Sequence, residues 1–109
     1  SKGRICMTFL KREDFSNLNA PRDESENLVN TLLTVSGVFV AVLLQEEDGY
    51  CRASIRTREP ADAREIARIW DGGGHIRAAG CKIRGTLSGA EKEFILRAGS
   101  IYEDRLPGN

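Results

Sequence analysis

The chain has 109 residues, which is enough for one domain with a modest hydrophobic core. Hydrophobic residues make up 40% of the sequence and charged residues 29%, a composition typical of globular proteins that excludes an intrinsically disordered chain. Basic and acidic residues both number 16, so any surface that binds nucleic acid has to be a local basic stripe and not a property of the whole chain.

The first third of the chain predicts a strand and then a helix. Residues Arg4 to Leu10 alternate between two faces, as a strand does. A polar loop follows, and Asp23 with Glu26 three residues later resembles a capping box at a helix start. We expect this helix to end at Gly37, with an apolar stripe formed by Leu28, Val29, Leu32 and Leu33.

The middle of the chain predicts a hairpin of two strands. Val38 to Leu44 is a continuous apolar run, as expected for a central strand covered on both faces. Asp48-Gly49 is a strong hairpin turn signal, and the returning strand is expected from Tyr50 to Arg58. This strand alternates, so that one of its faces carries Arg52, Ser54, Arg56 and Arg58.

The last part of the chain predicts helix, strand and helix. A short helix is expected from Ala61 to Trp70, after Glu59-Pro60 ends the preceding strand. A glycine-rich segment over residues 71–80 precedes a short strand from Cys81 to Arg84. Ser88 begins a capping box for the last helix, whose inward residues are expected to be Phe94, Ile95, Ala98, Ile101 and Tyr102.

The element order is therefore β-α-β-β-α-β-α. This order predicts a single domain over residues 1–109, of the α/β or α+β class, with helices packed on a mixed sheet of about four to five strands. The chain begins at Ser1 without a methionine, which suggests a domain excised from a larger protein.

The glycine-rich segment is the most informative feature of the sequence. Gly72-Gly73-Gly74 is followed directly by His75, the only histidine of the chain. Glycines allow a backbone to approach a ligand closely, and N–H groups around such a turn, joined by a helix start, form an anion-binding concavity. The segment therefore predicts a site for a phosphate or phosphodiester. A flexible connector with an incidental histidine is the alternative.

The arginine-bearing face of the hairpin strand is the second feature. Unpaired arginines are too costly to bury, so this face is either solvated, with partners such as Glu46 and Glu47, or reads phosphate with its guanidinium groups. Trp70 could stack on a base, but its helical spacing favours a core position.

The three cysteines, Cys6, Cys51 and Cys81, have no C-x-x-C spacing and are expected to be buried, reduced thiols. A zinc site formed with His75 has suitable ligand types but no ligand pair close in sequence. No apolar run approaches the roughly 20 residues of a membrane span, and no signal peptide opens the chain. A cytoplasmic protein without membrane contact is therefore expected.

Together, these motifs resemble a known family. The run Ser54-Ile55-Arg56-Thr57, a helix, and then G-G-G-H-x-R-A-A-G at residues 72–80 is similar to the DHH-associated C-terminal domain of DHH-family phosphoesterases. The likeness is greatest to the nano-RNase and pAp-phosphatase branch, also known as exopolyphosphatase-related proteins. The resemblance spans nearly the whole chain.

The resemblance implies roles for individual residues. Arg56 would grip a substrate phosphate with help from Ser54, and the backbone of Gly73 and Gly74 would hold the substrate's end together with the His75 side chain. The substrate-binding residues implied in this way are Arg52, Ser54, Arg56, Gly73, Gly74, His75 and Arg77. The family often has a fourth glycine where this chain has Asp71. Its carboxylate is expected to turn away and cap a short helix beginning at Gly74-His75; the alternative is that it faces the phosphate site and repels the anion.

The resemblance also implies that catalysis and substrate recognition lie in different domains. The chain has one histidine and no D-H-H motif, so it is expected to hold neither catalytic nor metal-binding residues. Those would lie in an N-terminal DHH domain that usually holds Mn²⁺. The chain would then be the substrate-recognition domain of a hydrolase acting on short oligoribonucleotides or pAp, and a homodimer is possible. The alternatives are the nucleic-acid-binding domain of a RecJ-like single-strand exonuclease and a degenerate interaction or oligomerisation module.

Overall fold

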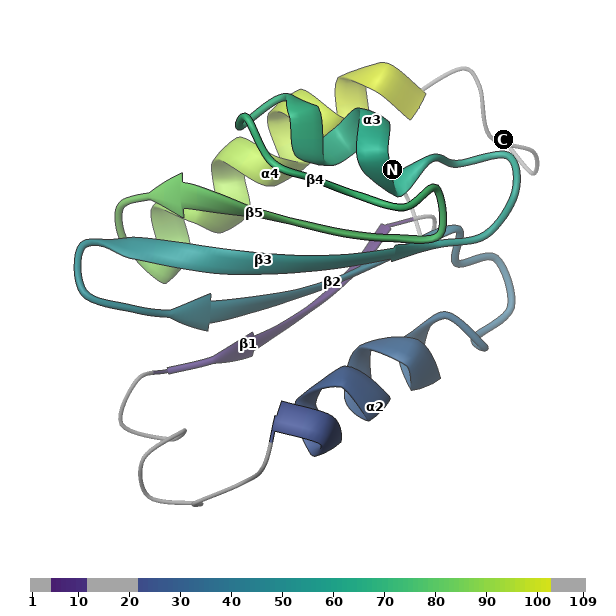
Figure 1. Cartoon of the computed structure of the whole chain (residues 1–109), viewed down its shortest axis with the longest axis horizontal. Helices are drawn as coiled ribbons and strands as arrows, with labels where there is room; N and C mark the ends of the chain where they lie inside the picture. The colour runs from purple at the N-terminus through teal and green to yellow at the C-terminus, as the bar shows by residue number, and fades with distance from the viewer. Residues whose placement is uncertain (1–4, 12–21, 103–109) are drawn as a thin grey trace.

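The computed structural model describes residues 5–11 and 22–102, without the side chains of residues 22–26. Within these ranges the chain forms one five-stranded sheet with the strand order β1-β2-β3-β5-β4 (Figure 1). The strands are β1 (Ile5–Leu10), β2 (Val40–Glu46), β3 (Tyr50–Thr57), β4 (Gly73–Gly74) and β5 (Ala78–Arg84), and the helices are α2 (Arg22–Leu32), α3 (Ala63–Arg68) and α4 (Leu87–Tyr102). The predicted α/β class is confirmed.

The sheet is mixed, as predicted. Strand β2 runs parallel to β1 and antiparallel to β3, and the remaining neighbours are also antiparallel. Residues 40–45 of β2 are all buried, so both faces of this strand are covered. The predicted central strand covered on both faces is therefore confirmed. The strand begins at Val40, two residues later than expected.

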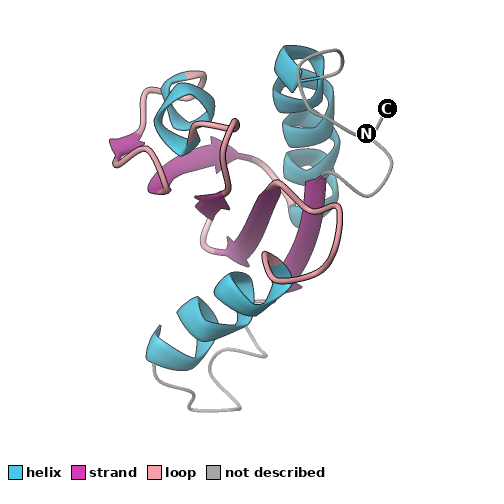
Figure 2. Ribbon diagram, turned by 90° about the vertical axis from the view of Figure 1, so that its right-hand side faces the viewer, coloured by secondary structure: helices cyan, strands magenta, loops and turns pink. Residues whose placement is uncertain are grey.

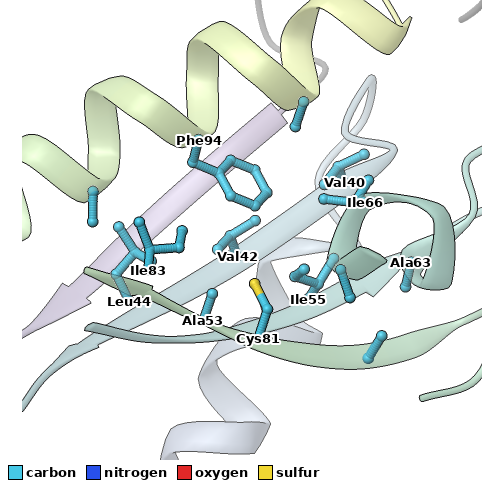
Figure 3. Packing of buried hydrophobic residues seen from close by; sticks show 14 of the residues in the cluster. Val40, Val42, Leu44, Ala53, Ile55, Ala63, Ile66, Cys81, Ile83 and Phe94 are labelled. Atoms are coloured by element: carbon cyan, nitrogen blue, oxygen red, sulfur yellow. The ribbon is translucent and has the colours of Figure 1, made fainter. Parts of the chain in front are cut away.

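Helices cover the two faces of the sheet unequally. In Figure 1, α3 and α4 lie on one side and α2 on the other, and Figure 2 shows the sheet between these layers. The larger core lies under α3 and α4 and includes Phe94, Ile66 and Ile55 (Figure 3). The smaller core lies under α2, where Val29 packs with Ala41 and Leu43 of β2. Among the described residues, no helix is both long and apolar enough to cross a membrane.

Strand β3 alternates as predicted. Its odd-numbered residues, from Cys51 to Thr57, are buried, whereas its even-numbered residues are partly exposed. Residues paired across a sheet lie on the same face, and Arg56 pairs with Ala41 of the smaller core. The even-numbered side chains of β3 therefore lie on the α2 face of the sheet, where they remain partly exposed.

Two helix boundaries differ from the prediction. Helix α2 ends at Leu32, and a series of turns carries the chain to Gly37; Leu28, expected in the apolar stripe, is 42% exposed. The side chains of the expected capping box, Asp23 and Glu26, lie outside the described residues. Helix α4 begins at Leu87 because the Thr86 hydroxyl accepts a hydrogen bond from the Gly89 N–H, so Ser88 is not the cap.

The other difference in helix α4 concerns its apolar side. Phe94, Ala98 and Tyr102 are buried as predicted, but Ile95 is 43% exposed. Ile95 directly follows Phe94, and adjacent residues of a helix point about 100° apart. The inward-facing stripe of α4 is thus narrower than the sequence suggested.

Helix α3 starts at a polar junction that sequence analysis missed. Asp62 caps the helix: its side chain accepts hydrogen bonds from the N–H groups of Arg64 and Glu65. The buried hydroxyl of Tyr102 accepts from the Asp62 N–H at 2.9 Å and lies 2.9 Å from a Glu65 carboxylate oxygen. This junction joins the beginning of α3 to the end of α4, so the short helix has a fixed origin.

We expect the Asp62 cap to give a pH-dependent part of the stability. Burial would raise the pKa of Asp62, but hydrogen bonds from the Arg64 side chain and from the Glu65 and Arg64 N–H groups outweigh burial and lower it. Asp62→Ala should lower the free energy of unfolding at pH 7 by about 1 kcal/mol. Because the folded pKa is lowered, this contribution is complete above the unfolded pKa of about 3.9 and is lost as the pH falls through the folded pKa.

The measurement is urea unfolding of both proteins at pH 7 and pH 3. The matched control is Asp62→Asn, which keeps a capping side chain without a titratable charge. An equal loss of stability for Asp62→Ala at both pH values would contradict the prediction.

Candidate functional site

The glycine-rich segment forms a hairpin, not a loop that leads into a helix. Strand β4 pairs with β5, so that Gly73 faces Gly80, and Gly74 faces Ala79. His75 and Ala78 then close a two-residue turn with reciprocal backbone hydrogen bonds of 2.7 and 3.2 Å. The expected helix at Gly74-His75 was therefore wrong, and no helix dipole acts there. Strand β5 also begins earlier than predicted, at Ala78.

The turn of this hairpin is fastened to two other elements. The Ile76 carbonyl accepts hydrogen bonds from the Thr57 hydroxyl at 2.9 Å and from the Ala63 N–H at 2.8 Å. The Arg77 carbonyl accepts from the Thr57 N–H at 3.1 Å. Thr57 is buried at the end of β3, and Ala63 begins α3. The position of His75 is thus set by the sheet and not by a free loop.

Three cross-strand rows follow from the register of β3, β5 and β4. Arg56 pairs with Ala78, which faces His75 across the turn. The next row on the same face holds Ser54, Gly80 and Gly73, and the third holds Arg52 and Lys82. We call these eight residues the open face, since each of them is exposed or partly exposed on the α2 side of the sheet. The structure thus brings Arg56 and His75 to one face, in one row.

Backbone packing requires glycine at two of the three consecutive glycine positions. A Cβ on Gly72 would lie 2.2 Å from the Gly80 carbonyl oxygen, and one on Gly74 would lie 2.6 Å from the Ala78 oxygen, so both positions exclude side chains. Gly74 also has a φ of +144°. Gly73 has neither constraint, because a Cβ there would meet nothing within 4 Å. Packing explains two of the glycines, and it leaves Gly73 as the one that keeps the open face bare.

The backbone of β4 is also directed for ligand contact. Because His75 and Ala78 exchange both hydrogen bonds, the adjacent pair of Gly74 and Ala79 is a non-hydrogen-bonded pair. The Gly74 N–H therefore points away from β5. Since β4 is the last strand of the sheet, this donor lies at a free edge.

A cavity of about 420 Å³ adjoins the open face. It is lined by Arg52, Ala53, Ser54, Trp70, Asp71, Gly72, Gly80, Cys81 and Lys82. The Nε atom of Arg52 and an Nη atom of Arg77 are shielded from solvent and have no hydrogen-bond partner among the described residues. The ion pairs found in that part of the chain, Arg64–Asp62 and Arg97–Glu93, involve no residue of β3.

Arg56 keeps most of its hydrogen-bonding capacity. One of its Nη atoms donates to the neighbouring Ile55 carbonyl at 3.1 Å, which leaves other donors of the guanidinium for a ligand. Arg58, by contrast, is used by the fold: it lies beyond the end of β3, donates to the Val38 carbonyl and covers the Phe39 ring. The predicted arginine face thus separates into ligand-accessible and structural members.

Lys82 is the member of the open face that sequence analysis missed. It is exposed, it pairs with Arg52, and its ammonium lies 5.4 Å from the Tyr50 ring centroid. The alternation of Ala78, Gly80 and Lys82 would have revealed it, had the strand been extended back to Ala78.

Trp70 is a packing residue, as its spacing indicated. Its ring stacks on Phe94 with centroids 5.5 Å apart, Arg97 lies over it, and its Nε1 donates to Glu93. These contacts hold the indole on α4, which removes it as a platform for a base.

The cysteines do not assemble with His75. Cys51 and Cys81 lie in the larger core, while Cys6 packs against the smaller core on the opposite face of the sheet. Burial raises the pKa of Cys81 to about 12, and burial with the nearby Glu46 and Glu47 raises the pKa of Cys51. Residues 5–11 and 22–102 contain no group of three or more His, Cys, Asp or Glu that could hold a metal ion.

Asp71 lies at the end of α3, where it does not cap a following helix. The Gly72 N–H donates to the Ala67 carbonyl and the Asp71 N–H to the Arg68 carbonyl, which is the hydrogen-bond pattern of a Schellman motif. In this motif Asp71 takes a left-handed conformation with a φ of +60°. Glycine is the residue that favours this position, so the expectation that Asp71 caps a helix start was wrong.

The whole described part of the chain matches a known domain family. The family model for the DHHA1 domain matches residues 3–102. The chain belongs to this family. The DHHA1 domain is the DHH-associated domain of DHH-family phosphoesterases, so the predicted resemblance is confirmed.

The relatives also indicate how much of a protein this chain represents. It is 31% identical over 83 residues to the bifunctional oligoribonuclease and PAP phosphatase NrnA of Bacillus subtilis, and 33% identical over 76 residues to NrnA of Thermus thermophilus. These matches cover 76% and 70% of this chain but only 26% and 24% of those proteins. The chain therefore spans about a quarter of the length of the curated relatives it matches.

A solved structure shows the same fold. The exopolyphosphatase-related protein of Bacteroides fragilis superposes with a TM-score of 0.80 and 25% identity, over 92% of this chain and 29% of that one.

Asp71→Gly should stabilise the fold. A non-glycine residue in the left-handed region costs roughly 1–2 kcal/mol, somewhat less for Asp. We expect the substitution to raise the free energy of unfolding by about 0.5–1 kcal/mol, measured by urea unfolding. Gly74→Ala is the opposite control, since its Cβ would meet the backbone of β5, and it should be strongly destabilising. A loss of stability on Asp71→Gly would show that the carboxylate has a structural partner.

Proposed function

We propose that this domain holds the phosphate end of a short oligoribonucleotide or of pAp for a metal-dependent phosphoesterase. The observation that carries the proposal is the row of Arg56, Ala78 and His75 beside the bare Gly73. Arg56 and His75 lie in this row on one face of the sheet, and the Gly74 N–H points outward from the adjacent free edge. The names of the two NrnA relatives support the choice of substrate.

Each residue has a physical role in this proposal. Arg56 forms charge-assisted hydrogen bonds to phosphate oxygens, and the Ser54 hydroxyl adds a donor one row away. His75 and the Gly74 N–H donate from the other side of the phosphate, and Gly73 lets it come close to the backbone. Arg77, in the turn next to His75, supplies further positive charge.

The catalytic part of the proposal lies outside this chain. The relatives are about three times as long as this chain, and the sequence has one histidine and no D-H-H motif. We therefore assign the metal, Mn²⁺, to a DHH domain of the parent protein. The residues described here do not fit a metal, so the contribution of this domain is binding and orientation of the substrate's end.

Arg56→Ala and His75→Ala should weaken substrate binding without unfolding the domain. Hydrogen bonds to charged groups contribute about 1.5–3 kcal/mol each, so each variant should bind roughly ten- to a hundredfold more weakly. The measurement is titration of a short oligoribonucleotide onto the parent protein, kept inactive with a chelator, together with thermal melts. Arg58→Ala is the control for losing an arginine outside the open face. Unchanged affinity with a large fall in melting temperature would make these residues structural.

Gly73→Ala tests whether phosphate binding needs a position without a side chain at residue 73. A methyl group at this position meets no atom of the fold, so stability should be unchanged or rise by a few tenths of a kcal/mol. The methyl group would occupy the space that the phosphate needs, and binding should fall at least tenfold. The same titration and melts apply. Normal affinity in this variant would place the ligand elsewhere.

A further inference from the structure

The third row of the open face has no role in the contacts proposed so far. Arg52 and Lys82 are direct cross-strand partners on the same face, although like charges in this arrangement repel each other. Both line the cavity, and the Arg52 Nε atom is shielded without a partner among the described residues. An anion bound between the two side chains would offset the repulsion between Arg52 and Lys82 and would supply a hydrogen-bond acceptor for the Arg52 Nε atom.

The charges around this cavity favour an anion. Its lining contains two cationic side chains, Arg52 and Lys82, and one carboxylate, that of the exposed Asp71. The lining therefore carries one net positive charge. Ser54 supplies a neutral hydroxyl at the boundary with the second row.

The spacing of the rows identifies the kind of anion. Every second residue of a strand advances about 6.6 Å, which is close to the separation of successive phosphates in an extended single strand. Arg56, Ser54 and Arg52 are successive even-numbered positions of β3, so the first and third rows lie about 13 Å apart. The middle row holds Ser54, Gly80 and Gly73, whose small size leaves a flat floor for the intervening nucleotide.

We propose that Arg52 and Lys82 form a second phosphate subsite, which binds the phosphate two nucleotides along from the one held by Arg56 and His75. This inference rests on the proposed function for the identity of the first phosphate. Arg56, Ser54 and Arg52 on β3 then follow the spacing of successive phosphates along the oligonucleotide. Oligonucleotides with three phosphates gain contacts that shorter ones cannot make.

The test is a length series: pA, pApA and pApApA, titrated onto the chelated parent protein. Lys82→Gln and Arg52→Gln should each weaken binding of pApApA about tenfold, the size expected for losing a charged contact, and change binding of pA and pApA less than twofold. The slope of log K against log salt for pApApA should become less steep by about 0.7, as for one phosphate contact with a single strand. Lys92→Gln, an exposed charge on α4 across the sheet, is the matched control and should change nothing.

The outcomes separate the two proposals. Equal weakening of all three ligands by the Arg52 and Lys82 variants, or no weakening of pApApA, would overturn the second subsite. Arg56→Gln should weaken all three ligands; if it weakens none while Lys82→Gln still weakens pApApA, the proposed phosphate-end site fails and the second subsite stands. If the unaltered protein binds none of the three ligands, both proposals fail.

Discussion

The carbonyl of Ile76 is the point on which the arrangement of the open face depends. It accepts hydrogen bonds from the Thr57 hydroxyl and from the Ala63 N–H, so one backbone atom joins the end of β3, the start of α3 and the β4–β5 turn. All the partners belong to buried or helical residues, which exclude competing water. Because the turn cannot swing away from β3, His75 stays in the same row as Arg56. This attachment also explains why residues 72 and 74 are glycines. The segment that contains β4 lies directly against β5, and a Cβ at either position would meet the backbone of β5.

The parts of the fold that the sequence predicted are those with a strong local pattern. The alternating pattern of β3 indicates burial on one face, and the continuous apolar run of β2 indicates burial on both faces. The ends of both strands lie within two residues of the predicted positions. The glycine-rich segment has no such pattern, because glycine has no side chain to show a period. Its pairing with β5 requires a close approach of the two backbones at Gly72 and Gly74, which no local signal reveals. For the same reason the last strand was expected to begin at Cys81, whereas it begins at Ala78.

The candidate site shows the same division. Arg52, Ser54 and Arg56 followed from the alternation of one strand, whereas Lys82 was missed because its strand was expected to begin at Cys81 and not at Ala78. Asp71 was misassigned because a carboxylate beside a glycine is common at helix starts, and the hydrogen bonds that identify a helix end connect it to residues before it. Asp62 was missed although Asp-x-x-Glu is a recognisable capping pattern, because the helix was expected to begin before this residue, at Ala61.

The neutral net charge of the chain is consistent with a site of limited length. Basic and acidic residues are equal in number, yet the open face carries Arg52, Arg56 and Lys82, and acidic residues such as Asp62 and Glu93 are paired with arginines elsewhere. At physiological ionic strength, interactions between exposed charges are largely screened beyond about 8 Å. Each cationic side chain therefore acts mainly on a phosphate directly beside it, and the total charge of the chain adds little to binding. Under the proposed function, the extent of the basic rows, and not the total charge of the domain, limits how much of a nucleic acid chain this surface can hold.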